Sequence, residues 1–92
     1  MQIIRSKPYN QALKTILSFI AKDKFTASEK FKKNLDEQIN NLINFPYKYR
    51  KSIYHESENI RDMTYKNYTI VYEIFENKII IMTIFNQNKP KD

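Results

Sequence analysis

Hydrophobic and polar positions follow two different periods along the chain, and the change falls near residue 57. In the first half, apolar side chains recur three and four residues apart, on one face of a helix, at Leu13, Ile16, Leu17 and Ile20. Pro8 precedes this stripe, and proline is tolerated in the first turn of a helix. We therefore predict a helix over residues 8–22, and the apolar run at residues 2–6 predicts an edge strand.

A second helical stripe begins after only a few residues, and it consists of Phe31, Leu35, Ile39, Leu42 and Ile43. Thr26 and Glu29 precede the stripe at the spacing of a capping box, with Thr26 as the N-cap. Pro46 ends the pattern, because proline does not continue a helix. We predict one helix over residues 26–44, and the short link makes it antiparallel to the first.

Beyond residue 57 the apolar positions alternate, as they do in strands. Residues 60–64 predict a short strand, and residues 68–75 predict a stronger one because β-branched and aromatic residues are concentrated there. Residues 78–86 are expected to return as its hairpin partner. The stretch Ile79–Met82 is apolar at every position, so we expect the last strand inside the sheet. The chain has no glycine, and Asn77 is expected to supply the positive φ of the tight turn before this strand.

The order β-α-α-β-β-β indicates an α+β fold, with a two-helix N-terminal hairpin packed on a small, mainly antiparallel sheet. The 92 residues are expected to form a single domain over 1–92. The absence of cysteine excludes disulfides and thiolate metal sites and fits a cytoplasmic location. We expect no targeting segment and no membrane span, because the longest apolar run, Ile79–Met82, is far too short.

Positive charge is concentrated in the first part of the chain. Residues 1–55 carry eleven Lys/Arg and four Asp/Glu, a balance of +7, whereas residues 56–92 carry five and six, a balance of −1. The two balances add to the formal net charge of +6. Such a field favours an acidic partner, which is nucleic acid, an acidic peptide or an anionic membrane. A solvated lysine-rich surface is the alternative interpretation.

The basic-aromatic segment, residues 46–57 with the sequence PYKYRKSIYHES, is the main candidate for a binding site. It combines three tyrosines, three cations and the only histidine of the chain. Cations contact phosphates and tyrosine rings stack on bases when proteins bind single-stranded nucleic acid. Alternatively, the tyrosines cover the end of the sheet and the lysines only solvate the loop. The candidate binding residues, two of them on or beside the neighbouring strand, are Lys48, Arg50, Lys51, Tyr54, Arg61 and Lys66.

Metal and cofactor chemistry has no support in the sequence. A lone histidine without cysteine matches no metal-ligand spacing, and a phosphate loop needs glycine, so neither a metal nor a cofactor is expected. We interpret His55 as a half-exposed loop residue, with proton transfer as the alternative.

The order of elements and the stretch YRKSIYHESENIRDMTYKNYTIVYEIFENKIIIMTIFNQNKP together resemble the RelE/ParE superfamily of bacterial toxins from type II toxin–antitoxin modules. The matching features are Pro46 at the end of the second helix, IRDM and NYTIVYEI on the strands, and the closing FNQNKP, which is similar to the endings of ParE-like members. The resemblance implies a toxin silenced by a small antitoxin protein. The positive first half indicates that this antitoxin is acidic.

The superfamily has two main activities, because RelE-like members cleave ribosome-bound mRNA and ParE-like members poison DNA gyrase. Where RelE-like members commonly carry an arginine this chain has Thr69, and no His-Tyr pair follows the last strand. The resemblance therefore favours a ParE-like inhibitor of gyrase, with mRNA cleavage or a non-toxic nucleic-acid-binding module as alternatives. For RNA cleavage, Arg61 or Lys89 would supply the cation and His55 would carry the proton.

Overall fold

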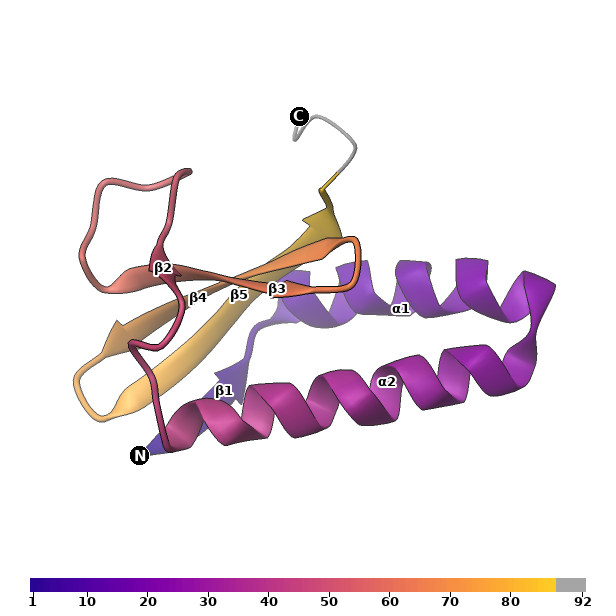
Figure 1. The fold of residues 1–92 in the computed structure, drawn as a ribbon, viewed down its shortest axis with the longest axis horizontal. Helices are drawn as coiled ribbons and strands as arrows, with labels where there is room; N and C mark the ends of the chain where they lie inside the picture. Colours follow the sequence, from indigo (N-terminus) through magenta and orange to yellow (C-terminus); the bar gives the residue numbers. More distant parts are fainter. Residues whose placement is uncertain (88–92) are drawn as a thin grey trace.

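The computed structural model describes residues 1–87, which form two α-helices, one 3-10 helix and five strands (Figure 1). In chain order the elements are β1 (Gln2–Arg5), α1 (Lys7–Asp23), α2 (Phe25–Asn40), η1 (Asn41–Ile43), β2 (Arg50–Lys51), β3 (Ile60–Tyr65), β4 (Tyr68–Phe75) and β5 (Lys78–Asn86). The predicted order of elements is confirmed, with β2 as an addition. This two-residue strand lies inside the basic-aromatic segment, where no alternation of apolar and polar residues predicts it.

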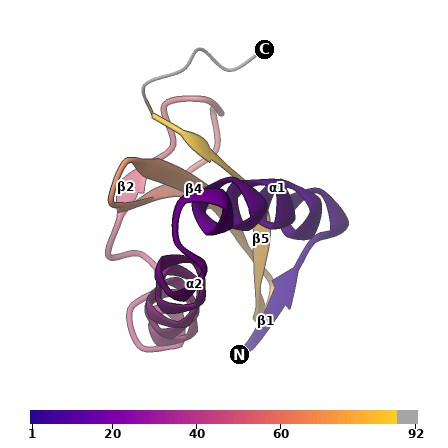
Figure 2. The same ribbon diagram turned by 90° about the vertical axis from the view of Figure 1, so that its right-hand side faces the viewer.

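The strands form one mixed sheet in the order β1-β5-β4-β3-β2. β1 runs parallel to β5, and all other neighbouring strands are antiparallel. Figure 2, which looks along the helices, shows β1 and β2 at opposite edges. β5 lies between β1 and β4, so the predicted interior position of the last strand is confirmed. The sheet and the helical hairpin together confirm the α+β fold.

Both helices contribute to a core on one face of the sheet, which we call the helical face. The helices contribute Tyr9, Leu13, Phe31, Leu35 and Ile39 to this core. The strands contribute Met63, Tyr65, Ile70, Tyr72, Ile74, Ile79, Ile81 and Ile84. Successive residues of a strand point to opposite faces, so the side chains between them lie on the other, open face. Within residues 1–87, none of the helices combines the length and apolarity that crossing a membrane requires.

Helix α1 begins at a serine cap that also ties the helix to the sheet. The hydroxyl of Ser6 accepts a hydrogen bond from the backbone N–H of Tyr9 at 3.2 Å and donates one to the carbonyl of Met82 at 2.9 Å. The first bond satisfies a free donor of the first turn, as N-caps do. Because Met82 lies on β5, the second bond fixes where the helix leaves the sheet.

Helices α1 and α2 are joined by the single residue Lys24, and the predicted capping box is therefore wrong. The carbonyl of Lys24 already accepts the backbone N–H groups of Ala27 and Ser28, so α2 begins at Phe25 and Thr26 lies inside its first turn. The hydroxyl of Ser28 donates to the carbonyl of Leu17 at 2.9 Å. This contact with α1 fixes the tight reversal, which leaves no room for a separate threonine cap.

The end of the second helix and the strand turns also differ in detail from prediction. Helix α2 ends at Asn40 and its expected last turn is the 3-10 helix η1, which leaves Ile43 exposed. In the β4–β5 turn the positive φ, 56°, belongs to Glu76 and not to Asn77. The two-residue turn requires this conformation at its first position, whatever residue stands there. Lys66 has the same role, with φ of 53°, in the β3–β4 turn.

Candidate functional site

The basic-aromatic segment wraps around the β3 side of the sheet and is bound to both faces. On the helical face, the buried hydroxyl of Tyr72 donates to the carbonyl of Pro46 at 2.6 Å. Burial raises the pKa of Tyr72 well above its ordinary value, so the hydroxyl keeps the proton that it donates. After β2 pairs with β3, the chain crosses to the open face, where the N–H of Ile53 donates to Oδ2 of Asp62 at 3.2 Å.

Arg61, a candidate both for phosphate contact and for catalysis, holds this segment in place. Its Nε donates to the carbonyl of Glu58 at 3.0 Å, and its Nη1 donates to the carbonyl of Tyr49 at 3.1 Å. The guanidinium also lies 4.9 Å from the centre of the Tyr47 ring, a cation–π distance. The side chain is only 17% exposed. Two of its five N–H donors are therefore bonded to backbone carbonyls, and its charge faces the Glu58 carboxylate at 3.9 Å.

Asp62 is buried beneath the segment and anchors it from below. The residue is 1% exposed, and its Oδ2 lies 3.7 Å from Nη2 of Arg50 in addition to the bond from Ile53. Its Oδ1 has no hydrogen-bond partner among residues 1–87. A buried carboxylate needs a compensating charge, and Arg50 is the cation placed to provide it. Arg50 nonetheless keeps more than half of its side chain exposed.

The remaining cations of the segment also face carboxylates or rings. Nζ of Lys51 lies 3.2 Å from Oε1 of Glu58, and the second carboxylate oxygen of Glu58 lies 3.9 Å from Arg61. Nζ of Lys48 lies 5.4 Å from the centre of the Tyr49 ring. The positive charge that the sequence concentrates here is thus largely balanced by acids from the following residues.

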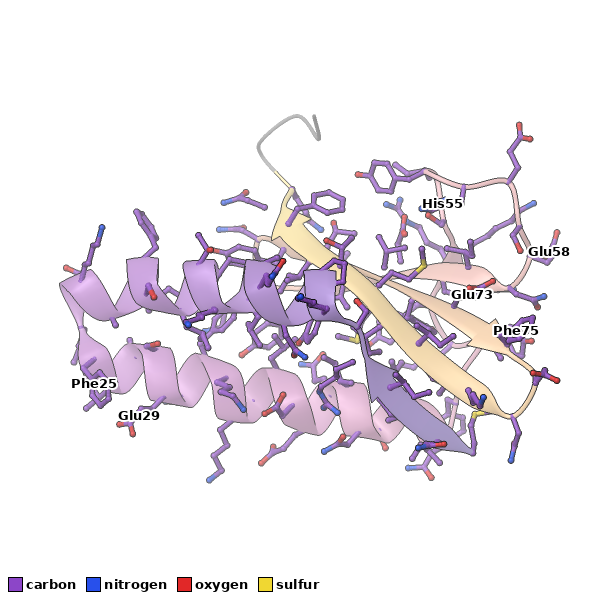
Figure 3. The ribbon with its side chains drawn as sticks, turned by 180° about the vertical axis from the view of Figure 1, so that it is seen from behind. Phe25, Glu29, His55, Glu58, Glu73 and Phe75 are labelled. Atoms are coloured by element: carbon purple, nitrogen blue, oxygen red, sulfur yellow. The ribbon has the colours of Figure 1, made fainter. Side chains whose placement is uncertain are left out.

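The structure gathers some of the predicted site residues and separates others. Arg50, Lys51 and Arg61 lie together at the β2–β3 pair. Lys66 lies at the opposite end of β3, in the turn to β4, next to the ring of Tyr65. His55 is half-buried on the loop between β2 and β3, which projects from the sheet (Figure 3). Lys89 lies outside the described residues.

The tip of the segment packs on the end of β5 and closes off one end of the open face. The rings of Tyr54 and Phe85 meet edge to face, with their centres 5.2 Å apart. Phe85 is the β5 partner of Thr69, which is 1% exposed. Thr69 is the position where RNA-cleaving relatives are expected to carry an arginine. Here that position is closed to solvent.

The other end of the open face is uncovered, and sequence reasoning missed it. The strand register places four half-buried side chains in one row across β1, β5, β4 and β3: Ile4, Ile80, Glu73 and Ile60. Phe75 follows Glu73 on the same face and is 52% exposed (Figure 3). The signal in the sequence that could have indicated this surface is the glutamate, Glu73, among the mostly apolar residues of β4. We call these five residues the Glu73 patch.

A five-stranded sheet with a helical hairpin on one face defines a small α+β domain. The family described as "ParE toxin of type II toxin-antitoxin system, parDE" matches residues 3–90 of this chain. The chain belongs to the ParE toxin family, which confirms the resemblance drawn from the sequence. Membership implies an antitoxin partner. Among curated proteins, none matches significantly.

Proposed function

We propose that this toxin arrests bacterial growth by inhibiting DNA gyrase, and that an acidic antitoxin neutralises it. The observation that carries the choice of target is the open face of the sheet. At the Thr69 position this face has a buried hydroxyl side chain, and its ionisable side chains on β3 and β4 are the carboxylates of Asp62 and Glu73. Its cation on β5, Lys78, lies at the opposite end, beside Phe75. This arrangement disfavours binding of a phosphate backbone along the face.

Cleavage of mRNA without a metal needs a base, an acid and a cation beside the scissile phosphate. Arg61 is the predicted catalytic cation that lies within the described residues, and its guanidinium donates to the carbonyls of Tyr49 and Glu58. Glu58 also places a carboxylate 3.9 Å from it. An incoming phosphate would have to compete with these groups, so the geometry favours an action without RNA hydrolysis.

The acidic antitoxin is supported by the charges of the helical hairpin. Exposed lysines that form no ion pair with residues 1–87 are concentrated there: Lys7, Lys14, Lys22, Lys24, Lys30 and Lys33. By contrast, the cations of the basic-aromatic segment are mostly balanced by carboxylates. Complementary charge steers association, so an acidic protein is drawn first to the helices.

The test is expression in a bacterial host, with growth, plasmid supercoiling and mRNA integrity recorded in the same cultures. We expect growth arrest, loss of negative supercoiling and intact mRNA, with growth restored by co-expression of the protein encoded beside the toxin. Codon-phased mRNA cuts that disappear in Arg61→Ala or His55→Ala would instead establish the RelE-like activity. Unimpaired growth, with salt-dependent binding of single-stranded RNA, would establish the non-toxic binding module.

A further inference from the structure

The Glu73 patch carries an unusual combination of side chains for a free surface. Three isoleucines lie in one row with a single carboxylate, and an exposed phenylalanine follows it on β4: Ile4, Ile80, Glu73, Ile60 and Phe75. One cation lies on the same face at the end of the hairpin, the exposed Lys78, which is the β5 partner of Phe75. The carboxylate of Glu73 forms no hydrogen bond or ion pair with any other described residue. Apolar side chains gathered around a few polar groups are typical of surfaces that bind a partner.

The carboxylate decides what kind of partner fits. Nucleic acid and anionic lipid are disfavoured, because Glu73 would face their phosphates in apolar surroundings. A second copy of this chain would use the same patch on both subunits. Lys78 lies beyond Phe75 at the end of the hairpin, so a copy centred on the isoleucine row would bring two Glu73 carboxylates together. Like charges at an interface core cost several kcal/mol, and a second copy is therefore disfavoured as well. A partner segment that presents a cationic side chain between apolar ones can pair with the carboxylate of Glu73 and cover the isoleucines at the same time.

We propose that the Glu73 patch binds a segment of the antitoxin that presents one arginine or lysine between apolar side chains. The cation pairs with the carboxylate of Glu73, and the flanking side chains cover Ile60, Ile80 and Phe75. This inference rests on the proposed function in one respect, the existence of the antitoxin. It also assigns the two faces different tasks, because the helices attract the acidic part of the partner and the open face accepts a basic residue.

The test measures the affinity of purified toxin variants for the antitoxin encoded beside the toxin, by calorimetry at two salt concentrations. Glu73→Gln should weaken binding about tenfold and Glu73→Lys about a hundredfold or more, since the second change opposes two cations. Phe75→Ser should weaken binding about tenfold. Matched controls lie off the patch and off the two helices, where Glu56→Gln on the β2–β3 loop and Phe45→Ser after η1 should change affinity by less than about threefold.

Each outcome separates the inference from the proposed function. An antitoxin that binds the wild-type toxin and the Glu73 variants equally well overturns the inference and leaves the toxin assignment intact. A wild-type toxin that no antitoxin binds overturns both. Toxin that dimerises alone, and becomes monomeric in Phe75→Ser, assigns the patch to a second copy and overturns the inference. Thermal melting of each variant confirms that it is folded, and the lysine and glutamine variants provide two independent readings.

Discussion

Arg61 provides the sharpest test of how the basic-aromatic segment is built, because a scaffold role and a phosphate-binding role predict different responses to lysine. Arg61→Lys keeps the positive charge but removes the fork of nitrogen atoms that contacts the carbonyls of Tyr49 and Glu58. Arg61→Ala removes the charge as well. If the residue contacts phosphate, the lysine variant should keep most of the function, and neither variant should lose much stability.

The expected loss of stability follows from the contacts. A hydrogen bond from a charged donor contributes about 1.5–3 kcal/mol when buried, and we take about 1 kcal/mol for each of the two bonds because Arg61 is 17% exposed. The cation–π contact with Tyr47 adds about 0.5 kcal/mol. Arg61→Ala should therefore lower the free energy of unfolding by about 2–3 kcal/mol. Arg61→Lys should lose about 1–2 kcal/mol, because one ammonium cannot serve both carbonyls.

Urea unfolding of the purified toxin, followed by circular dichroism, measures both losses. Lys30→Ala is the control, since Lys30 is an exposed cation of α2 without an ion pair among residues 1–87, and it should change stability by less than about 0.5 kcal/mol. A loss below about 0.5 kcal/mol in both Arg61 variants would refute the scaffold role. In that case, Arg61 would again be available as a phosphate ligand.

Three further predictions concern buried tyrosines and a turn. Tyr72→Phe leaves the Pro46 carbonyl without its donor and should lower the free energy of unfolding by about 1–2 kcal/mol. Tyr9→Phe removes a buried hydroxyl that has no hydrogen-bond partner among residues 1–87, so it should be neutral or stabilising. Equal losses of stability in urea unfolding would contradict this difference. Burial, aided by the charge of Asp36, raises the pKa of Tyr9 from 10.0 to about 12. Because this tyrosine ionises at a lower pH in the unfolded chain than in the folded one, its contribution to stability is complete below about pH 10 and falls by about 2 kcal/mol towards pH 12. Tyr9→Phe should remove that part of the loss of stability at high pH. A fall of equal size in the wild-type protein and in Tyr9→Phe would contradict this prediction. Glu76→Asn should raise the thermal midpoint by a few degrees, about 0.5–1 kcal/mol, because asparagine tolerates the φ of 56° better; a lower midpoint would argue against strain there.

The sequence predicts those parts of the fold that depend on the spacing of apolar residues within a single helix or strand. The helical spacing of Leu35 and Ile39 and the alternation around Ile70 identify residues that are all buried in the core. These positions are predictable because each element repeats its own pattern, whatever it packs against. The family resemblance depends on the same ordered elements, and the match to residues 3–90 confirms it.

The details that sequence reasoning missed depend on contacts between distant residues. Thr26 has the properties of an N-cap, but the packing of Ser28 against α1 moves the start of the helix. The partners of Arg61 are set by the β2–β3 register and by a loop that returns to the same strand. The pairing of Arg50 with Asp62 has the same origin, so the charge of the segment could not be judged from its composition.

The Glu73 patch could not be predicted for a related reason. Its side chains come from β1, β3, β4 and β5, and only the strand order brings them into one row. Which half of the open face remains uncovered depends on the loop that carries Tyr54 towards Phe85. Neither the order of strands nor the path of this loop follows from the period of the sequence.

The choice of target is tested most directly by adding purified toxin to purified DNA gyrase and relaxed plasmid, and measuring supercoiling in the presence of ATP. Inhibition that increases with toxin concentration, and that is reversed by the antitoxin encoded beside it, is the predicted result. The same toxin preparation should leave mRNA intact on translating ribosomes. Full supercoiling at every toxin concentration, together with cleavage of that mRNA, would contradict the assignment to gyrase.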